Sequence, residues 1–231
     1  MNKALIIKTN PFDVYENMSC DEIFCETMPE KYILRFFNWA KNGITFGLSQ
    51  RFSVVLKELN EIEQSLDITR RPTGGGLVIH KNDITFSFIF YSPEEFNPLK
   101  TYEKLHTAIT KEYLKNGIEL NLLNSKTQNY DINNNITNCF KKPVEKDIMA
   151  GNRKILGGAI RKFSDYILYQ ASLQMPDARE NLMLHSKIII KAFEKEFNLS
   201  FHEFILNDLY YHKITQKKQE KYSNQNWIKR I

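Results

Sequence analysis

Cysteine is scarce in this chain, and long apolar stretches are missing. The three cysteines, Cys20, Cys25 and Cys139, are too few and too scattered for a disulfide framework, which predicts a reducing, cytoplasmic location. No apolar run is long enough to cross a membrane, and no N-terminal segment has the layout of a signal peptide. The sequence therefore predicts neither a secreted disulfide-rich protein nor a membrane protein.

Patterns typical of metal sites and nucleic-acid binding are missing as well. The five histidines show no metal-ligand spacing, so we predict no metal site. The net charge of +5 is only moderately basic, and basic residues alternate with acidic ones through most of the chain. This charge suits an acidic partner protein or an anionic ligand, and we expect no nucleic-acid partner because no recognition motif is present.

The bulk composition is that of a folded enzyme-sized domain. Hydrophobic residues make up 42% of the 231 residues and aromatic residues 13%, which is enough for a sizeable core. Strand-like and helix-like segments alternate along the chain. We predict a single domain over residues 1–231, with a helical C-terminal part from about residue 178 and no separate accessory domain.

Local signals predict several elements. Asp13 followed by Glu16 resembles a capping box, which would open a helix. Val78–His80 and Ile84–Tyr91 flank a short polar turn, which predicts a β-hairpin, and alternation in its second arm places the phenylalanines on one face. Pro98 begins a second helical pattern.

The second half of the chain contains two segments that are poor in apolar residues and, between them, two predicted strands. Residues 124–138 contain six asparagines and predict a mobile surface loop. Strands are predicted to resume over residues 154–162 and Tyr166–Leu173. The last dozen residues are polar and basic, so we expect them to be loose.

A glycine-rich segment with two preceding arginines carries most of the functional information. Gly74, Gly75 and Gly76 expose backbone N–H groups without side chains and can adopt positive φ, so they could point several amides at one anionic oxygen. Arg70 and Arg71 would add fixed positive charge. The segment is neither a P-loop nor a dinucleotide fingerprint. The alternative is a simple turn between two strands.

A second small-residue segment follows a lysine. Lys154 is a compact charge on a flexible stem, suited to a carbonyl or phosphate oxygen. Gly157, Gly158 and Ala159 remove bulk from the strand after it, so a slim apolar chain could pass there. The alternative is a surface lysine beside a weak, kinked strand.

Together, Arg-Arg-Pro-Thr-Gly-Gly-Gly-Leu-Val-Ile-His and Arg-Lys-Ile-Leu-Gly-Gly-Ala-Ile-Arg resemble the lipoate–protein ligase A and octanoyltransferase family, which is related to the biotin–protein ligases. Three flanking stretches match in order, and the resemblance covers roughly residues 12–175. It implies an α+β fold of mixed, mainly antiparallel sheets with flanking helices and a curved acyl tunnel. The residues that it implies for substrate binding are Arg70, Arg71, Gly74, Gly75, Gly76, His80, Gly157, Gly158 and Ala159.

The resemblance also implies a reaction, the attachment of an octanoyl or lipoyl group to a lysine of a lipoyl carrier domain of the glycine cleavage H protein or dehydrogenase E2 type. Lys154 matches the lysine that holds the acyl carbonyl. The region of Cys139 resembles the cysteine-dependent octanoyltransferases, which take octanoate from acyl carrier protein through a thioester and need no cofactor. A thiolate near Lys154 and the arginines would have a lowered pKa. The alternative is an inert buried thiol.

Other readings of the family remain open. An ATP-dependent lipoate–protein ligase would need ATP and magnesium, and Asp147 matches an acidic position of the ligases. Where many members have His-Gly-Ser, this chain has Gln170 followed by Ala-Ser, and an amide cannot carry a proton as imidazole does. A non-catalytic module that binds an acyl carrier or nucleic acid is a third possibility, testable by the salt dependence of binding. We expect a monomer with no membrane partner.

Overall fold

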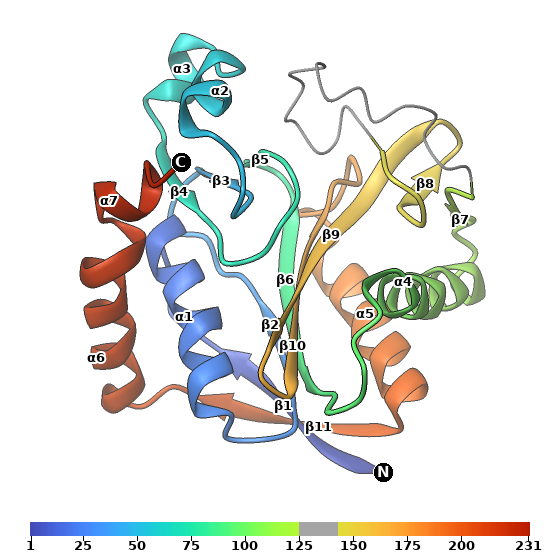
Figure 1. The fold of residues 1–231 in the computed structure, drawn as a ribbon. Helices are drawn as coiled ribbons and strands as arrows, with labels where there is room; N and C mark the ends of the chain where they lie inside the picture. Colours follow the sequence, from blue (N-terminus) through green and yellow to red (C-terminus); the bar gives the residue numbers. More distant parts are fainter. Residues whose placement is uncertain (125–142) are drawn as a thin grey trace.

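The computed structural model describes residues 1–124 and 143–231 (Figure 1). The predicted surface loop over residues 124–138, apart from its first residue, and the candidate nucleophile Cys139 lie outside the described residues.

The described residues form two sheets. In order across the larger one, its eight described strands are β11 (Leu199–Ile205), β1 (Asn2–Lys8), β2 (Tyr32–Phe36), β6 (Ile84–Tyr91), β10 (Tyr166–Leu173), β9 (Arg153–Phe163), β8 (Ile148–Ala150) and β7 (Asn121–Leu122). The first two pairings, β11 with β1 and β1 with β2, are parallel, and the others are antiparallel. The smaller sheet has the order β4 (Asp67–Arg70), β3 (Gly43–Phe46) and β5 (Val78–His80). The prediction of an α+β fold with mixed, mainly antiparallel sheets is confirmed.

Helices cover both faces of the large sheet (Figure 1). The helical elements are α1 (Val14–Thr27), α2 (Phe52–Lys57), α3 (Glu61–Gln64), α4 (Pro98–Lys115), α5 (Leu182–Phe197), α6 (Asp208–Lys217), the π-helical turn η1 (Lys218–Tyr222) and α7 (Gln225–Ile228). The pair α4 and α5 packs on one face, while α1 and α6 pack on the other. Within the described ranges, no helix combines the length and the apolarity needed to span a membrane.

Local signals set the ends of two helices. The Asp13 side chain accepts a hydrogen bond from the Glu16 backbone and the Glu16 side chain accepts one from the Asp13 backbone, so the predicted capping box at the start of α1 is confirmed. Asn97 caps α4 in front of Pro98, whose missing N–H costs nothing at the first helical position.

Strand β6 runs through the centre of the large sheet and is buried on both faces. Phe86, Phe88 and Phe90 point to the cluster that includes α4 and α5, which confirms the predicted alternation. The residues between them point towards α1, where the Ser87 hydroxyl donates to Asp21. The polar positions of β6 therefore also lie in the interior.

The predicted hairpin between Val78–His80 and Ile84–Tyr91 is wrong. Strand β5 pairs with β3 in the small sheet, whereas β6 pairs with β2 and β10 in the large one. The side chain of Asp83 in the turn accepts hydrogen bonds from groups on both sheets, including His80 and Thr85. These bonds hold the chain as it passes from one sheet to the other.

The C-terminal part contains the helices α5, α6 and α7, and it differs from the prediction in two details. The strand β11 interrupts the helical region and pairs in parallel with β1. The last dozen residues are packed and not loose, since Ile228 is buried and α7 lies against β4. Both errors have the same cause, because the partners of these segments lie more than 150 residues away along the chain.

Candidate active site

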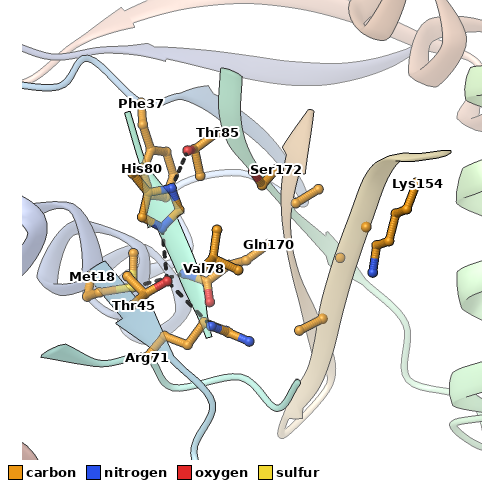
Figure 2. A pocket seen from close by; sticks show the side chains of 14 residues that line it. Met18, Phe37, Thr45, Arg71, Val78, His80, Thr85, Lys154, Gln170 and Ser172 are labelled. Atoms are coloured by element: carbon orange, nitrogen blue, oxygen red, sulfur yellow. Dashed lines mark hydrogen bonds between the residues drawn. The ribbon is translucent and has the colours of Figure 1, made fainter. Parts of the chain in front are cut away.

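A cavity of about 40 Å³ lies between the small sheet and strands β9 and β10 (Figure 2). Its lining residues come from both sheets, α1 and the segments between them: Met18, Phe37, Thr45, Arg71, Val78, His80, Thr85, Lys154, Gly157, Gly158, Ala159, Gln170, Ala171 and Ser172. Two parts of this lining carry the charged groups. We name them the His80 wall (Thr45, Arg71, Val78, His80 and Thr85) and the Lys154 wall (Lys154, Gly157, Gly158 and Ala159).

The imidazole of His80 is held on three sides. Its Nδ1 lies 2.8 Å from Asp83 Oδ2, and its Nε2 lies 2.9 Å from Thr45 Oγ1. The Trp39 ring stacks on the imidazole at 4.6 Å between centroids. An ionised carboxylate can only accept, so Nδ1 donates to Asp83. The ring orientation is therefore determined by its neighbours.

The Asp83 carboxylate anchors this network. Thr85 and Ser172 hydroxyls each donate to Oδ2 at 2.7 Å, in addition to the bond from His80. Burial alone raises the pKa of Asp83, but the charge and hydrogen bond of His80 and the two hydroxyls outweigh it and lower the pKa below its ordinary value. The carboxylate thus stays ionised and connects β5, β6 and β10.

Gln170 links the glycine-rich segment to α1. Its Oε1 accepts the Thr73 hydroxyl at 2.7 Å, and its Nε2 donates to Asp21 Oδ2 at 2.7 Å. The other carboxylate oxygen of Asp21 accepts from Arg35 Nη2 at 2.7 Å and from the Ser87 hydroxyl at 2.7 Å. Because every partner is buried, the amide at position 170 has one allowed orientation.

The two neighbouring arginines point to different places. Arg71 lines the cavity, and its Nε and Nη2 donate to Gly74 O at 3.0 and 2.6 Å. Arg70 is fully buried and does not line the cavity described here; its guanidinium donates to backbone carbonyls. Those carbonyls belong to Gly47, Leu48, Gln50, Trp227 and Ile228.

The three glycines lie beside the cavity and are not among its lining residues within the described part of the chain. Gly75 adopts φ +83°, a conformation that favours glycine. A Cβ added to Gly47 would lie 1.9 Å from Gly75 O, so the loop that contains Gly75 packs directly against the backbone of Gly47. Gly74 contributes the carbonyl that Arg71 holds. The loop positions Arg71 through its backbone.

Lys154 forms a buried ion pair with Asp147. Its Nζ lies 2.8 Å from Asp147 Oδ2, and both side chains are almost fully buried. The carboxylate also accepts from the Tyr102 hydroxyl at 2.6 Å and from the Val144 backbone at 2.7 Å. The Tyr102 oxygen in turn accepts from Gly158 N at 2.9 Å. Burial, and then the charge of Asp147, raise the pKa of Tyr102 well above its ordinary value, so the phenol remains a hydrogen-bond donor.

The small residues of the Lys154 wall make room for particular side chains. A Cβ on Gly157 would lie 2.3 Å from Lys154 Cε and 2.5 Å from its Nζ. A Cβ on Gly158 would lie 2.3 Å from Tyr169 Cε2. Gly157, Gly158 and Ala159 line the cavity as the sequence suggested, but the space left by the two glycines is taken by Lys154 and Tyr169.

The structure brings together most of the candidate residues. Arg71, His80, Lys154, Gly157, Gly158 and Ala159 line one cavity, while Arg70 and the three consecutive glycines support it from outside. In Figure 2, Lys154 stands apart from His80 and Arg71, on the other side of β9. Among the described residues, no group of three or more His, Cys, Asp or Glu side chains is placed to hold a metal ion.

Sequence reasoning missed two supporting side chains. Asp83 follows His80 by three residues, and that spacing within a turn could have indicated the pair. Tyr102 lies on the buried face of α4 and looks like an ordinary core residue in the sequence, so its contact with Asp147 had no local signal.

Comparison with known proteins identifies the family of the chain. The model of the lipoyl protein ligase A/B catalytic domain matches residues 13–193. The chain belongs to this enzyme family. Octanoyltransferase LipM of Clostridioides difficile is 24% identical over the whole of both chains. A putative lipoate protein ligase from T. acidophilum with bound lipoic acid, Ta0514, superposes over the whole of both chains with a TM-score of 0.79 at 19% identity. A lipoate-protein ligase A bound with ATP gives 0.77 at 20% identity, with 99% of each chain covered. The family expected from the two motifs is confirmed.

Proposed function

We propose that this chain transfers an octanoyl group from acyl carrier protein to a lysine ε-amine of a lipoyl carrier domain, of the glycine cleavage H protein or dehydrogenase E2 type. The relatives named octanoyltransferase LipM support this reaction. The observation that carries the proposal is the cavity itself, which has a buried ammonium in one wall and a guanidinium in the other. Acyl transfer needs such fixed positive groups where negative charge develops on the carbonyl oxygen.

The proposed chemistry has two steps. In the first, the Cys139 thiolate attacks the donor thioester, the bond between the acyl carbon and the donor sulfur breaks, and the donor leaves as a thiol after taking up a proton. In the second, the acceptor amine attacks the Cys139 thioester and loses a proton, so that an amide forms and the thiolate returns. Lys154 would stabilise the oxyanion in both steps. Cys139 lies outside the described residues, so its part rests on the sequence alone.

The direct test is the intact mass of the protein after incubation with octanoyl acyl carrier protein. We expect a gain of one octanoyl group, carried by Cys139 and lost when a lipoyl domain is added. Cys139→Ala should gain nothing. Cys20→Ala is the matched control, because Cys20 is fully buried in α1 and should leave loading unchanged. Loading that persists in Cys139→Ala would contradict the thioester.

An ATP-dependent lipoate–protein ligase is the second candidate, favoured by the ion pair between Lys154 and Asp147, the acidic position typical of ligases. ATP would supply the energy to activate a free acid as an acyl-adenylate, and Lys154 and Arg71 are the cavity cations that would hold its phosphates. Asp147 already accepts hydrogen bonds at both oxygens, so it offers little to a magnesium ion while Lys154 remains paired.

The two candidates are separated by their donors. Wild type and Cys139→Ala are assayed on a lipoyl domain with octanoyl acyl carrier protein, and in parallel with free octanoate or lipoate plus ATP and magnesium. Transfer from the carrier without ATP, abolished in Cys139→Ala, supports the transferase. Transfer from the free acid that needs ATP and survives in Cys139→Ala supports the ligase. A monomeric state and a cytoplasmic location remain predictions.

A further inference from the structure

Arg70 connects two parts of the molecule that are far apart in sequence. Its Nε and Nη2 donate to Trp227 O at 3.2 Å and Ile228 O at 2.9 Å, two carbonyls at the end of α7. Its Nη1 donates to Leu48 O and Gln50 O, each at 2.7 Å. With a longer bond from Nη1 to Gly47 O at 3.4 Å, one planar guanidinium therefore binds five carbonyls from two segments, which the single ammonium of a lysine could not do.

The contact with α7 is reciprocal. The Trp227 indole N–H donates to Arg70 O at 2.9 Å, and just before α7 the carbonyl of Tyr222, in η1, accepts from the Thr69 hydroxyl at 2.7 Å. Arg70 also lies over the Phe46 ring, with 4.7 Å to its centroid. Strand β4, which leads into the glycine-rich segment, is thereby fastened to the last helical turn of the chain described here.

The other carbonyls held by Arg70 lead towards the cavity. Leu48 N donates to Thr73 O at 2.9 Å, and the Thr73 hydroxyl donates to Gln170, which lines the cavity. Directly after Arg70, Arg71 N donates to Phe46 O at 2.9 Å. This continuous set of contacts runs from α7 through Arg70 to two cavity-lining residues.

We propose that Arg70 is a positioning residue, and that it couples α7 to the glycine-rich segment so that α7 helps to set the shape of the acyl cavity. The sequence suggested a substrate-binding role for Arg70, and the geometry gives it a different one. The proposal rests on the proposed acyl-transfer function for its kinetic readout, and a binding readout that needs no catalysis accompanies it.

The kinetic test uses Arg70→Gln, Trp227→Ala and the double variant, with transfer to a lipoyl domain measured at saturating acceptor. A misplaced wall weakens the fit of the acyl chain, so we expect the KM for the acyl donor to rise about tenfold in each single variant with little change in kcat. Both changes break the same contact between β4 and α7. The KM of the double variant should therefore be no higher than that of the more strongly affected single variant. Arg51→Gln removes an exposed arginine and should match wild type.

A gentler variant covers the case in which Arg70→Gln does not fold. Trp227→Phe keeps an aromatic ring and removes only the N–H that donates to Arg70 O, so we expect a KM increase of about threefold, the size of one net hydrogen bond.

The binding test uses fluorine NMR of protein labelled with 5-fluorotryptophan. The chain has two tryptophans: Trp39 stacks on His80 beside the cavity, and Trp227 lies on α7. Octanoate should shift both signals in wild type. In Arg70→Gln, octanoate should shift only the Trp39 signal, and a higher octanoate concentration than in wild type should be needed.

Each other outcome overturns a particular statement. If Arg70→Gln raises the KM while both Trp227 variants keep the wild-type KM, Arg70 acts through Leu48 and Gln50, and the coupling to α7 is absent. If all variants match wild type, the coupling is absent. If wild type transfers no acyl group from any donor, the proposed function is wrong, and the fluorine signals still decide whether Arg70 couples α7 to the cavity.

Discussion

The two walls of the cavity hold their polar groups in different ways. In the His80 wall the imidazole is bound at both nitrogens and covered by a ring, and its partners come from several strands. In the Lys154 wall a long, flexible side chain lies over Gly157 and is fastened at its end to Asp147. The first arrangement fixes the shape of the His80 wall, because each of these side chains is hydrogen-bonded to or packed against the others. The second holds its charge at the end of a flexible side chain, in an ion pair with Asp147.

The comparison predicts that the largest effect lies at the Lys154 wall. Lys154→Met should lower kcat by about 100- to 1,000-fold, the effect of losing one preorganised oxyanion contact. It should also destabilise the fold by about 3–5 kcal/mol, because Asp147 would be left as an unpaired buried charge. Urea unfolding and transfer kinetics measure the two effects.

The double variant Lys154→Met with Asp147→Asn separates these effects. It removes the unpaired charge, so stability should recover while activity should not. Recovery of activity would show that Lys154 serves only to neutralise Asp147.

A smaller effect is expected when each glycine of that wall receives one methyl group. In Gly157→Ala the new Cβ meets the far end of Lys154, which can move, so the fold should be kept while activity falls about tenfold through the displaced ammonium. In Gly158→Ala it meets the buried ring of Tyr169, so stability should fall by about 1–3 kcal/mol. Thermal unfolding and kcat measured on both variants test this contrast, and the reverse pattern would contradict the assignment of space in the wall.

The His80 wall should respond through stability and its pH dependence. Asp83→Asn should cost about 1–2 kcal/mol at neutral pH, because strong bonds to a carboxylate are lost. The folded-state pKa of Asp83 lies below its ordinary 3.8, so its stabilisation is present above that value and is lost as the pH falls through the lower folded-state pKa. The free energy of unfolding of Asp83→Asn should therefore fall less steeply below pH 4 than that of wild type. Parallel curves would mean that the carboxylate contributes nothing.

The smallest effect is expected in α1, away from the charged groups of both walls. Burial raises the pKa of the Cys20 thiol to about 12, and it also raises the pKa of Cys25 well above the ordinary value. Neither thiol should react with iodoacetamide in the folded protein at pH 8, and Cys20→Ala should keep full activity. With a reactive Cys139, mass spectrometry should show a single adduct; modification of Cys20 would contradict its burial.

Elements with short-range causes were predictable from the sequence. The capping box of Asp13 and Glu16 and the Asn97 cap before Pro98 act within one turn, so the starts of α1 and α4 follow from the residues present. The alternation in β6 likewise places its phenylalanines on one face. The two glycine-containing motifs were enough to indicate the family, and they contain seven of the fourteen cavity-lining residues.

Features that depend on distant partners were not predictable. The side chains of Arg70 and Arg71 are equal in charge and adjacent in the chain, and only the folded structure sends one to the carbonyls of α7 and the other into the cavity. The same holds for β5, which leaves β6 to pair with β3. The sequence by itself determined which residue types meet at this site. The tertiary structure decided which of them face the cavity, because buried carbonyls and carboxylates must find donors wherever the fold brings them.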